Sequence, residues 1–283
     1  MKQASHLSIR ATIFCRMRRR FFVDRFESTS ASLRGEAAEH LGRVLRAEPG
    51  QLYELSDGRR VWLGRIERVA LSKRGDNRIE FALVEPIPAL EPALQIELLI
   101  SLVKFDRFEW CLEKATELGA TEITPLAAAR TDKPLVAAAA KRLARWEKIA
   151  LESAQQSRRL RPPVLRSPIP ATRAFALSSA ARKIVLSERR DAPPLREVLA
   201  GILGGRNPGS DESPEVPKGA LAAEENRALV VALAIGPEGG WTDEEIAAAR
   251  VAGFAVASLG ENILRMETAV LASMAILSFA LGR

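Results

Sequence analysis

Cysteine, histidine and long apolar runs are scarce in this sequence. Its 283 residues include two cysteines, Cys15 and Cys111, and two histidines, His6 and His40. Two distant cysteines do not make a disulfide framework, so we expect a reducing compartment, the cytoplasm. So few ligands argue against a Cys/His metal site. No apolar run approaches the roughly 20 residues that span a bilayer, and the basic start lacks the apolar stretch of a secretory signal, so we expect no membrane partner.

Positive charge is distributed unevenly along the chain. The sequence has 42 Lys and Arg against 35 Asp and Glu. Residues 1–80 contain 17 Lys and Arg and 10 Asp and Glu. Residues 81–283 therefore contain 25 residues of each sign and carry no net charge. A basic N-terminal region on a neutral remainder favours binding of a polyanion such as nucleic acid by that region. Basic residues scattered for solubility are the alternative.

Residues 18–84 show short β-type patterns and are interpreted as a small β-barrel-like unit. The predicted elements are a hairpin over 51–69 that turns at Asp57-Gly58, a strand over 78–85 and a short helix over 36–45. Residues 1–17 are expected to form a flexible extension, with Met17 as an alternative start. The proline-containing stretch 85–93 is expected to be a linker.

Residues 94–283 alternate between apolar strands and amphipathic helices. Strands are predicted over 94–103, 122–128, 183–188, 229–236 and 254–260, and helices over 107–120 and 141–159. Continuous apolar strands separated by helices indicate an α/β domain with a mostly parallel sheet. The Gly-, Pro- and acid-rich stretch 204–228 is expected to be a flexible insertion.

The stretch "LVVALAIGPEGGWTDEEI" (229–246) reads as a buried strand, a glycine-rich turn and a helix start. Thr242 and Glu245 form a T-x-x-E capping box. Such turns at the carboxyl ends of parallel strands bind ligands in α/β sheets. Neither phosphate-binding glycine motif is present, and Glu238 would repel a pyrophosphate. A nucleotide-like ligand without phosphates, such as S-adenosylmethionine, fits better, although a merely tight connection remains open.

A second stretch, "SLGENILRMETAV" (258–270), places charge at the mouth of the apolar C-terminal helix. Locally, Glu267 and Thr268 could cap that helix, and an acid there suits the helix dipole. Arg265 could pair with Glu261 at the surface. An alternative is that Arg265 serves an active site.

Taken together, "IGPEGGWTDEE" and "LGENILRMETA" resemble the paired signature of the SPOUT methyltransferases of the RsmE type. Further segments resemble that family in the same order: "RRRFFVD", "HLGRVLR", "KFDRFEWCLEKATELGATEITPL" and "ALESAQQSRRLRPPV". The resemblance covers residues 18–280 apart from 204–228. The chain departs from the family at Asn262, commonly Arg, and at Arg158, usually a small residue, whereas the often aromatic position 241 is Trp.

The resemblance implies a fold and an activity. It implies a PUA-like RNA-binding barrel over 18–84 and a SPOUT α/β domain over 94–283 with a deep trefoil knot, typically in a homodimer. It implies S-adenosylmethionine-dependent methylation of N3 of a uridine in 16S rRNA of the small ribosomal subunit. Open alternatives are an RNA-binding assembly protein without catalysis, and a SPOUT enzyme acting on another RNA or on a ribose hydroxyl.

The resemblance also implies site residues. Arg265, Glu267 and Arg159 are the catalytic candidates, Arg265 to orient the uracil or stabilise charge on it, and Glu267 as a possible base. The cofactor-binding candidates are Leu186, Ser187, Ile235, Gly236, Pro237, Glu238, Gly239, Gly240, Leu259, Gly260, Ile263, Leu264, Arg265, Met266, Thr268 and Ala269. Basic residues and their neighbours are the RNA-binding candidates: Arg18, Arg19, Arg20, His40, Arg43, Arg46, Lys104, Gln156 and Arg158.

Overall fold

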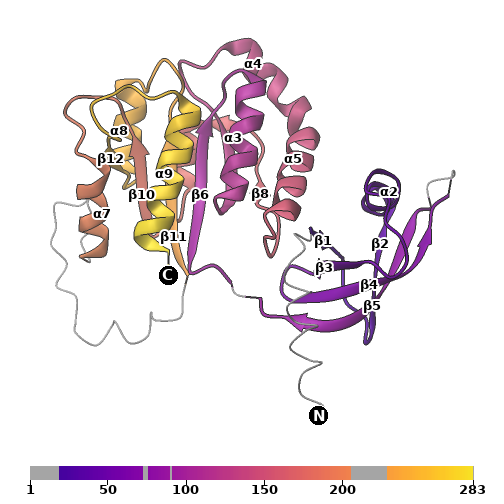
Figure 1. The fold of residues 1–283 in the computed structure, drawn as a ribbon. Coiled ribbons are helices and arrows are strands. Elements are labelled where there is room, and N and C mark those ends of the chain that lie inside the picture. Colours follow the sequence, from indigo (N-terminus) through magenta and orange to yellow (C-terminus); the bar gives the residue numbers. More distant parts are fainter. Residues whose placement is uncertain (1–18, 73–75, 90, 205–227, 283) are drawn as a thin grey trace. The chain divides into compact units, whose positions relative to one another are not determined.

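The computed structural model describes residues 19–72, 76–89, 91–204 and 228–282 (Figure 1). The predicted extension 1–17, together with Arg18, and nearly all of the predicted insertion 204–228 lie outside these residues. The chain divides into two compact units, unit 1 (Met1–Leu90 with Ala154–Arg161) and unit 2 (Glu91–Ser153 with Pro162–Arg283). The sequence pattern does not predict that residues 154–161 belong to unit 1.

Unit 1 is built on a curled mixed sheet. Its elements are β1 (Arg20–Phe22), β2 (Ser30–Arg34), α2 (Gly35–Glu39), a π-helical turn (His40–Val44), β3 (Leu52–Ser56), β4 (Val61–Ala70) and β5 (Arg78–Ile87). The strand order is β1-β3-β4-β5-β2, in which only the β1–β3 pair is parallel. Two irregularities in the β4–β5 register curl the sheet around a core that includes Phe21, Leu55 and Phe81.

The predicted hairpin of unit 1 is present, since β3 and β4 pair antiparallel around Asp57 and Gly58. Gly58 has a φ of 83°, which favours glycine. The Asp57 carboxylate accepts backbone N–H bonds from Arg59 and Arg60. Burial alone would raise the pKa of Asp57, but the hydrogen bonds from Arg60 and Arg59 lower it. These hydrogen bonds within the turn help to fix the register in which β3 and β4 pair.

Unit 2 is an α/β domain with a parallel sheet, as the sequence predicts. Its strands are β6 (Leu94–Ser101), β7 (Ala120–Ala127), β8 (Val164–Leu165), β9 (Ile169–Pro170), β10 (Arg182–Leu186), β11 (Leu229–Ile235) and β12 (Ala255–Ala257). The order is β12-β10-β11-β6-β7-β8, and β9 also pairs with β7. Every recorded pairing is parallel.

Helices cover both faces of the sheet in unit 2 (Figure 1). On one face pack α3 (Phe105–Glu117), α5 (Leu143–Gln156), α7 (Leu195–Leu203) and α9 (Met266–Leu281), and on the other α6 (Ala171–Leu177) and α8 (Asp243–Val251). Neighbouring residues of β6 divide between the faces, since Leu98 joins the first core and Leu99 the second. Strands buried on both faces explain their continuous apolar runs.

Several predicted boundaries are wrong. The helix predicted over 141–159 is preceded by α4 (Lys133–Ala139) and a 3-10 turn (Ala140–Arg142), and α5 ends at Gln156. Arg158 adopts a φ of 55°, which cannot continue a helix. The strand predicted over 254–260 is only β12, because its last residues enter a loop. Among the described residues, no helix combines the length and apolar character needed to cross a bilayer.

Candidate functional site

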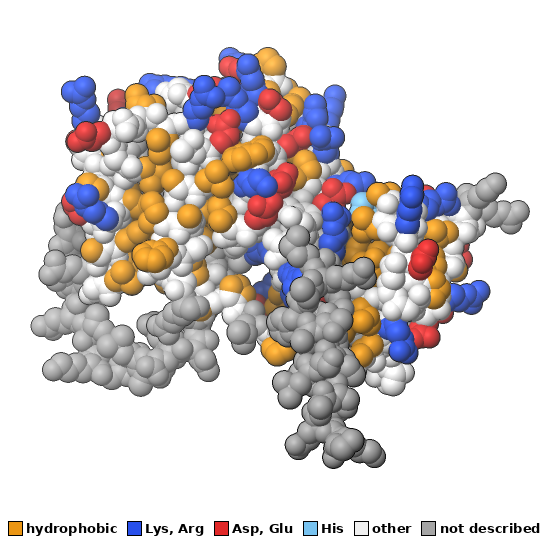
Figure 2. Space-filling view, viewed as in Figure 1, with side chains coloured by type: hydrophobic (Ala, Val, Ile, Leu, Met, Phe, Trp, Pro, Cys, Tyr) orange, Lys and Arg blue, Asp and Glu red, His pale blue; other side chains and the backbone are white. Residues whose placement is uncertain are grey.

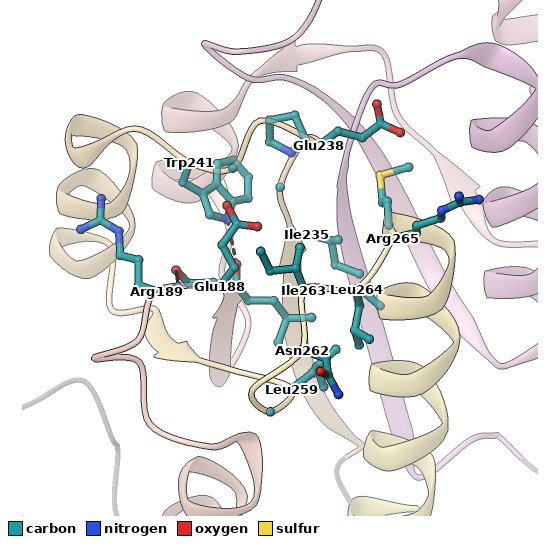
Figure 3. Close-up of a pocket in the computed structure, with 18 of the residues that line it drawn as sticks. Glu188, Arg189, Ile235, Glu238, Trp241, Leu259, Asn262, Ile263, Leu264 and Arg265 are labelled. Carbon is teal, nitrogen blue, oxygen red and sulfur yellow. Dashed lines mark hydrogen bonds between the residues drawn. The ribbon is translucent and has the colours of Figure 1, made fainter.

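A cavity of about 520 Å³ lies in unit 2 at the carboxyl ends of the adjacent strands β10 and β11. Its walls are the loops that follow these strands and the loop that leads into α9 (Figure 3). The lining residues are Arg107, Leu186, Ser187, Glu188, Arg189, Ile235, Gly236, Pro237, Glu238, Gly240, Trp241, Leu259, Gly260, Asn262, Ile263, Leu264, Arg265, Met266 and Ala269. This is the edge at which parallel sheets bind ligands.

Trp241 fixes one wall of the cavity. Its indole is buried, and its Nε1–H donates to the carbonyl oxygen of Leu186 at 2.9 Å, which joins the loop after β11 to the end of β10. The ring lies against Gly236, where a Cβ atom would approach Cε2 of Trp241 to 2.9 Å. Glycine at 236 is therefore required by the close approach of the indole.

The turn between Gly236 and Trp241 is held by hydrogen bonds from both sides. The amide of Gly240 donates to the carbonyl of Pro237 at 2.8 Å, and Gly240 has a φ of 70°. Arg130 Nη1 donates to the carbonyl of Gly239 at 2.6 Å from outside. The turn is thereby fixed in one shape with its inner backbone facing the cavity.

The helix that follows this turn begins with the predicted capping box. Thr242 Oγ1 accepts from the amide of Glu245, and the Glu245 carboxylate accepts from the amide of Thr242. Glu245 is buried and also accepts from the amide of Ala129 at 2.8 Å. One carboxylate therefore fixes both the start of α8 and the loop after β7.

Most charged side chains at the cavity are paired. The guanidinium of Arg107, on α3, contacts the carboxylate of Glu238 and lies 3.5 Å from that of Glu267. The guanidinium of Arg189 contacts Asp243 at the start of α8. Within the described residues, Arg265 and Glu188 have neither an ion pair nor a side-chain hydrogen bond. They are the charges at the cavity that remain for a ligand.

The loop from Leu259 to Arg265 is open to solvent. Gly260 has a φ of 124°, and the side chain of Ile263 is 81% exposed. The helix α9 begins at Met266 with Arg265 as its N-cap residue, and no side chain caps it. The interpretation of Glu267 and Thr268 as caps is therefore wrong, because both lie inside the first turn. Among the described residues, Arg265 does not pair with Glu261 either.

The structure brings together nearly all of the residues predicted to bind a cofactor. Gly239 and Thr268 do not line the cavity; the carbonyl of Gly239 faces Arg130, and Thr268 is exposed on α9. The others lie on its wall. The sequence analysis did not assign Arg107, Glu188, Arg189, Trp241 and Asn262 to the cavity. Trp241 and Asn262 could have been assigned from the sequence, since they lie inside the two quoted motifs.

The three catalytic candidates lie in different places. Arg265 lines the cavity, whereas Glu267 is not among the lining residues and faces Arg107. Its Oε2 atom is buried without a hydrogen-bond partner in the described residues. Burial raises the pKa of the Cys111 thiol, on α3, to about 12, and the negative charge of Glu267 contributes to raising this pKa. Arg159 belongs to unit 1, where burial and then Arg161 lower its pKa to about 10.

The RNA-binding candidates differ in exposure. Arg19, Arg43, Arg46, Lys104, Gln156 and Arg158 are exposed. Arg20 donates from Nε and Nη2 to one oxygen of the buried Glu54, and Arg158 lies 3.6 Å from the other. Arg20 is therefore committed to the interior of unit 1. His40 is half-buried, and its Nε2 has no partner among the described residues.

Comparison with known proteins defines the class first. A family described as "RNA methyltransferase domain" matches residues 90–278. The small-subunit ribosomal RNA methyltransferase E of Synechocystis is 33% identical over 83% of this chain and 68% of its own length. The chain therefore belongs to the RsmE-type family of RNA methyltransferases.

Two solved structures share this fold. A ribosomal RNA small subunit methyltransferase E from Neisseria gonorrhoeae, bound to S-adenosylmethionine, has a TM-score of 0.72, 29% identity, and coverage of 94% of this chain and 98% of its own. A methyltransferase described as putative from Legionella pneumophila, in complex with the same cofactor, has a TM-score of 0.72, 28% identity, and coverage of 94% and 99%.

The packing of Trp241 against Gly236 leads to a first prediction. Gly236→Ala should push the indole from its position and lower the free energy of unfolding by about 1–3 kcal/mol, as overpacking does. Chemical denaturation measures this loss. Adding Trp241→Phe, which leaves a smaller ring, should recover part of it. Purely additive losses in the double variant would contradict the contact.

Proposed function

We propose that this protein transfers a methyl group from S-adenosylmethionine to N3 of a specific uridine in 16S rRNA of the small ribosomal subunit, in the cytoplasm. The observation that carries the proposal is the cavity, which the two motif-bearing segments line together with Arg265, an arginine that has no ion pair among the described residues. Family membership and the names of the relatives support the class of reaction.

The cavity suits the donor in its size and its lining. A volume of about 520 Å³ is within the range of small-molecule sites. Leu186, Ile235 and Leu264 offer apolar contact for an adenine ring, and Gly236 and Gly240 leave backbone groups accessible. When bound, the donor supplies a methyl group on a positively charged sulfur. The hydrogen bond from Trp241 to Leu186 holds together the carboxyl ends of β10 and β11, which would contact the donor.

Arg265 gives the site a means to stabilise the acceptor. Methylation at N3 of a uracil forms an N3–CH3 bond, breaks the sulfur–methyl bond of the donor and releases the N3 proton to water. Negative charge therefore develops on the flanking carbonyl oxygens as this proton leaves. An exposed guanidinium without an ion pair among the described residues can donate hydrogen bonds to such an oxygen. Glu267 faces Arg107 instead of the cavity, so our proposal uses it to position Arg107 and not as the base.

The second prediction tests the reaction and the role of Arg265 together. In rRNA from a deletion strain, mass spectrometry should find one 16S uridine without its N3-methyl group, and the wild-type gene should restore it. Arg265→Ala should lower kcat by about 10²-fold or more with little change in donor affinity, because it acts on developing charge.

Different outcomes would point to the alternatives. Unchanged 16S uridines, with a methyl group missing from another RNA or from a ribose hydroxyl, would replace the proposed substrate. Absence of donor binding at millimolar concentration in calorimetry would favour an assembly protein without catalysis. Equal losses of kcat and donor affinity in Arg265→Ala would make Arg265 a binding residue only.

We further propose that unit 1 binds the RNA backbone as a PUA-like domain. Its exposed Arg19 and Arg46, each without an ion pair among the described residues, are suitable contacts for phosphate. In the third prediction, Arg19→Gln with Arg46→Gln should reduce the slope of log affinity against log salt by up to about 2. Arg173→Gln with Arg250→Gln, an equal charge change in unit 2, should leave the slope unchanged. Equal effects would argue against a specific surface on unit 1.

A homodimer is proposed from the outer face of α9. Phe279 is 92% exposed there and Ile276 39%, and Figure 2 shows hydrophobic side chains gathered on this face of unit 2. An exposed apolar stripe of this kind marks an interaction site, and we assign it to a second copy of the chain.

We also propose that unit 2 contains the trefoil knot of its family. A knot would appear as a residual shortening of the chain when the unfolded protein is pulled from both ends.

The fourth prediction concerns that face. Phe279→Glu should convert a dimer into a monomer in analytical ultracentrifugation, because a charge would be buried at the interface. Val251→Glu changes an equally exposed residue on α8, on the opposite face of the sheet, and should leave the dimer intact. A wild-type protein that is monomeric at about 100 μM would refute the proposal, since interfaces of standard size bind far more tightly.

A further inference from the structure

Two charges at the cavity are left without an ion pair in the part of the chain that the structure describes. One is Arg265, which the proposed reaction uses. The other is Glu188, which lies two residues beyond β10 and lines the cavity. Its carboxylate carries a charge that neither the fold nor the proposed chemistry explains.

The side chain of Glu188 lies against the glycine turn. A Cβ atom at position 240 would approach Oε1 of Glu188 to 2.4 Å, so Gly240 makes room for this carboxylate. Figure 3 shows Glu188 close to Trp241, on the side of the cavity away from Arg265. The turn and the carboxylate are therefore packed as one surface.

The neighbouring arginines do not neutralise Glu188. Arg189 turns its guanidinium to Asp243 on α8. Arg130 donates to the carbonyl of Gly239. Glu238, the other carboxylate on the wall, is paired with Arg107. Glu188 is thus the wall carboxylate that makes no ion pair within the described residues. The Arg130 guanidinium lies near it without pairing, since a Cβ atom at position 240 would be 2.4 Å from Oε1 of Glu188 and 3.9 Å from Nη1 of Arg130.

A carboxylate without an ion pair among the described residues distinguishes the two forms of the cofactor, if the proposed function holds. S-adenosylmethionine carries a positive sulfonium, whereas its product, S-adenosylhomocysteine, has a neutral thioether at the same place. Their ammonium and carboxylate groups are identical. The cavity volume equals that of a sphere about 10 Å across, close to the Debye length at about 0.1 M salt. Over such a distance salt screens the field of the Glu188 carboxylate only in part, so that this field acts on a ligand in the cavity.

We propose that Glu188 is a specificity-determining residue that favours the positively charged donor over the neutral product. Because its side chain is exposed and water screens it, the expected discrimination is modest, about three- to tenfold. Its consequence is that the product leaves the site more readily than the donor, which limits product inhibition.

The fifth prediction is tested by calorimetric titration of the full-length protein with each ligand. Glu188→Gln should weaken binding of S-adenosylmethionine about three- to tenfold and leave that of S-adenosylhomocysteine within twofold. Glu188→Asp, which keeps the charge, should retain most of the discrimination. The matched control is Glu244→Gln, which removes an exposed charge on α8 that does not line the cavity, and should change neither affinity. Raising salt from about 0.05 to 0.5 M should reduce the discrimination in the wild type, in Glu188→Asp and in Glu244→Gln, and should have no such effect in Glu188→Gln.

The outcomes separate this inference from the function on which it rests. If neither ligand binds the wild type, the proposed function fails. If both bind and Glu188→Gln weakens both equally, Glu188 contacts a group common to donor and product, and the inference is overturned. An equal change in Glu244→Gln would also overturn it, because the effect would then belong to net charge and not to position.

Discussion

The site depends on one interaction, the hydrogen bond from the indole of Trp241 to the carbonyl of Leu186. It joins the loop after β11 to the end of the adjacent β10, so that the two strand ends present a single surface. The ring also requires glycine at position 236, because any side chain there would meet it. A buried tryptophan with a satisfied N–H is rigid as well as apolar, and it converts a flexible glycine turn into a wall.

Pairing of charges then determines what this wall can do. Arg107 and Arg189 would add positive charge to the cavity if they were alone, but each is matched by an acid on a neighbouring segment. In the part of the chain that the structure describes, the charges left without an ion pair at the cavity are Arg265 on one side and Glu188 on the other. In the proposed reaction this opposition suits a positively charged donor and an acceptor that becomes negative, because each charge favours one of the partners.

The residues of the site could be predicted to different degrees. The turn at 236–240 and the T-x-x-E box were readable, because glycine conformation and helix capping depend on a few consecutive residues. The positions of β10 and β11 followed from their apolar runs, but the strand predicted over 183–188 runs past the end of β10 at Leu186. Glu188 was therefore counted as a strand residue, and Arg189 gave no signal, since a charged residue after a strand is usually part of a solvated loop. The helix start at Met266 was also missed, and with it the position of Glu267 inside the first turn.

The sequence alone therefore determined the α/β class, the presence of β6, β7, β10, β11 and β12, and the turn that borders the cavity, since these follow from short-range patterns of burial and backbone preference. It did not predict the two-residue strands β8 and β9. Only the tertiary structure decided which charges remain for a ligand. Arg107 and Glu238 are 131 residues apart, and Arg189 and Asp243 are 54 apart. Such pairs exist because β11 lies between β6 and β10 in the sheet, so that the segments after these three strands meet. No local pattern encodes the partner of a charge.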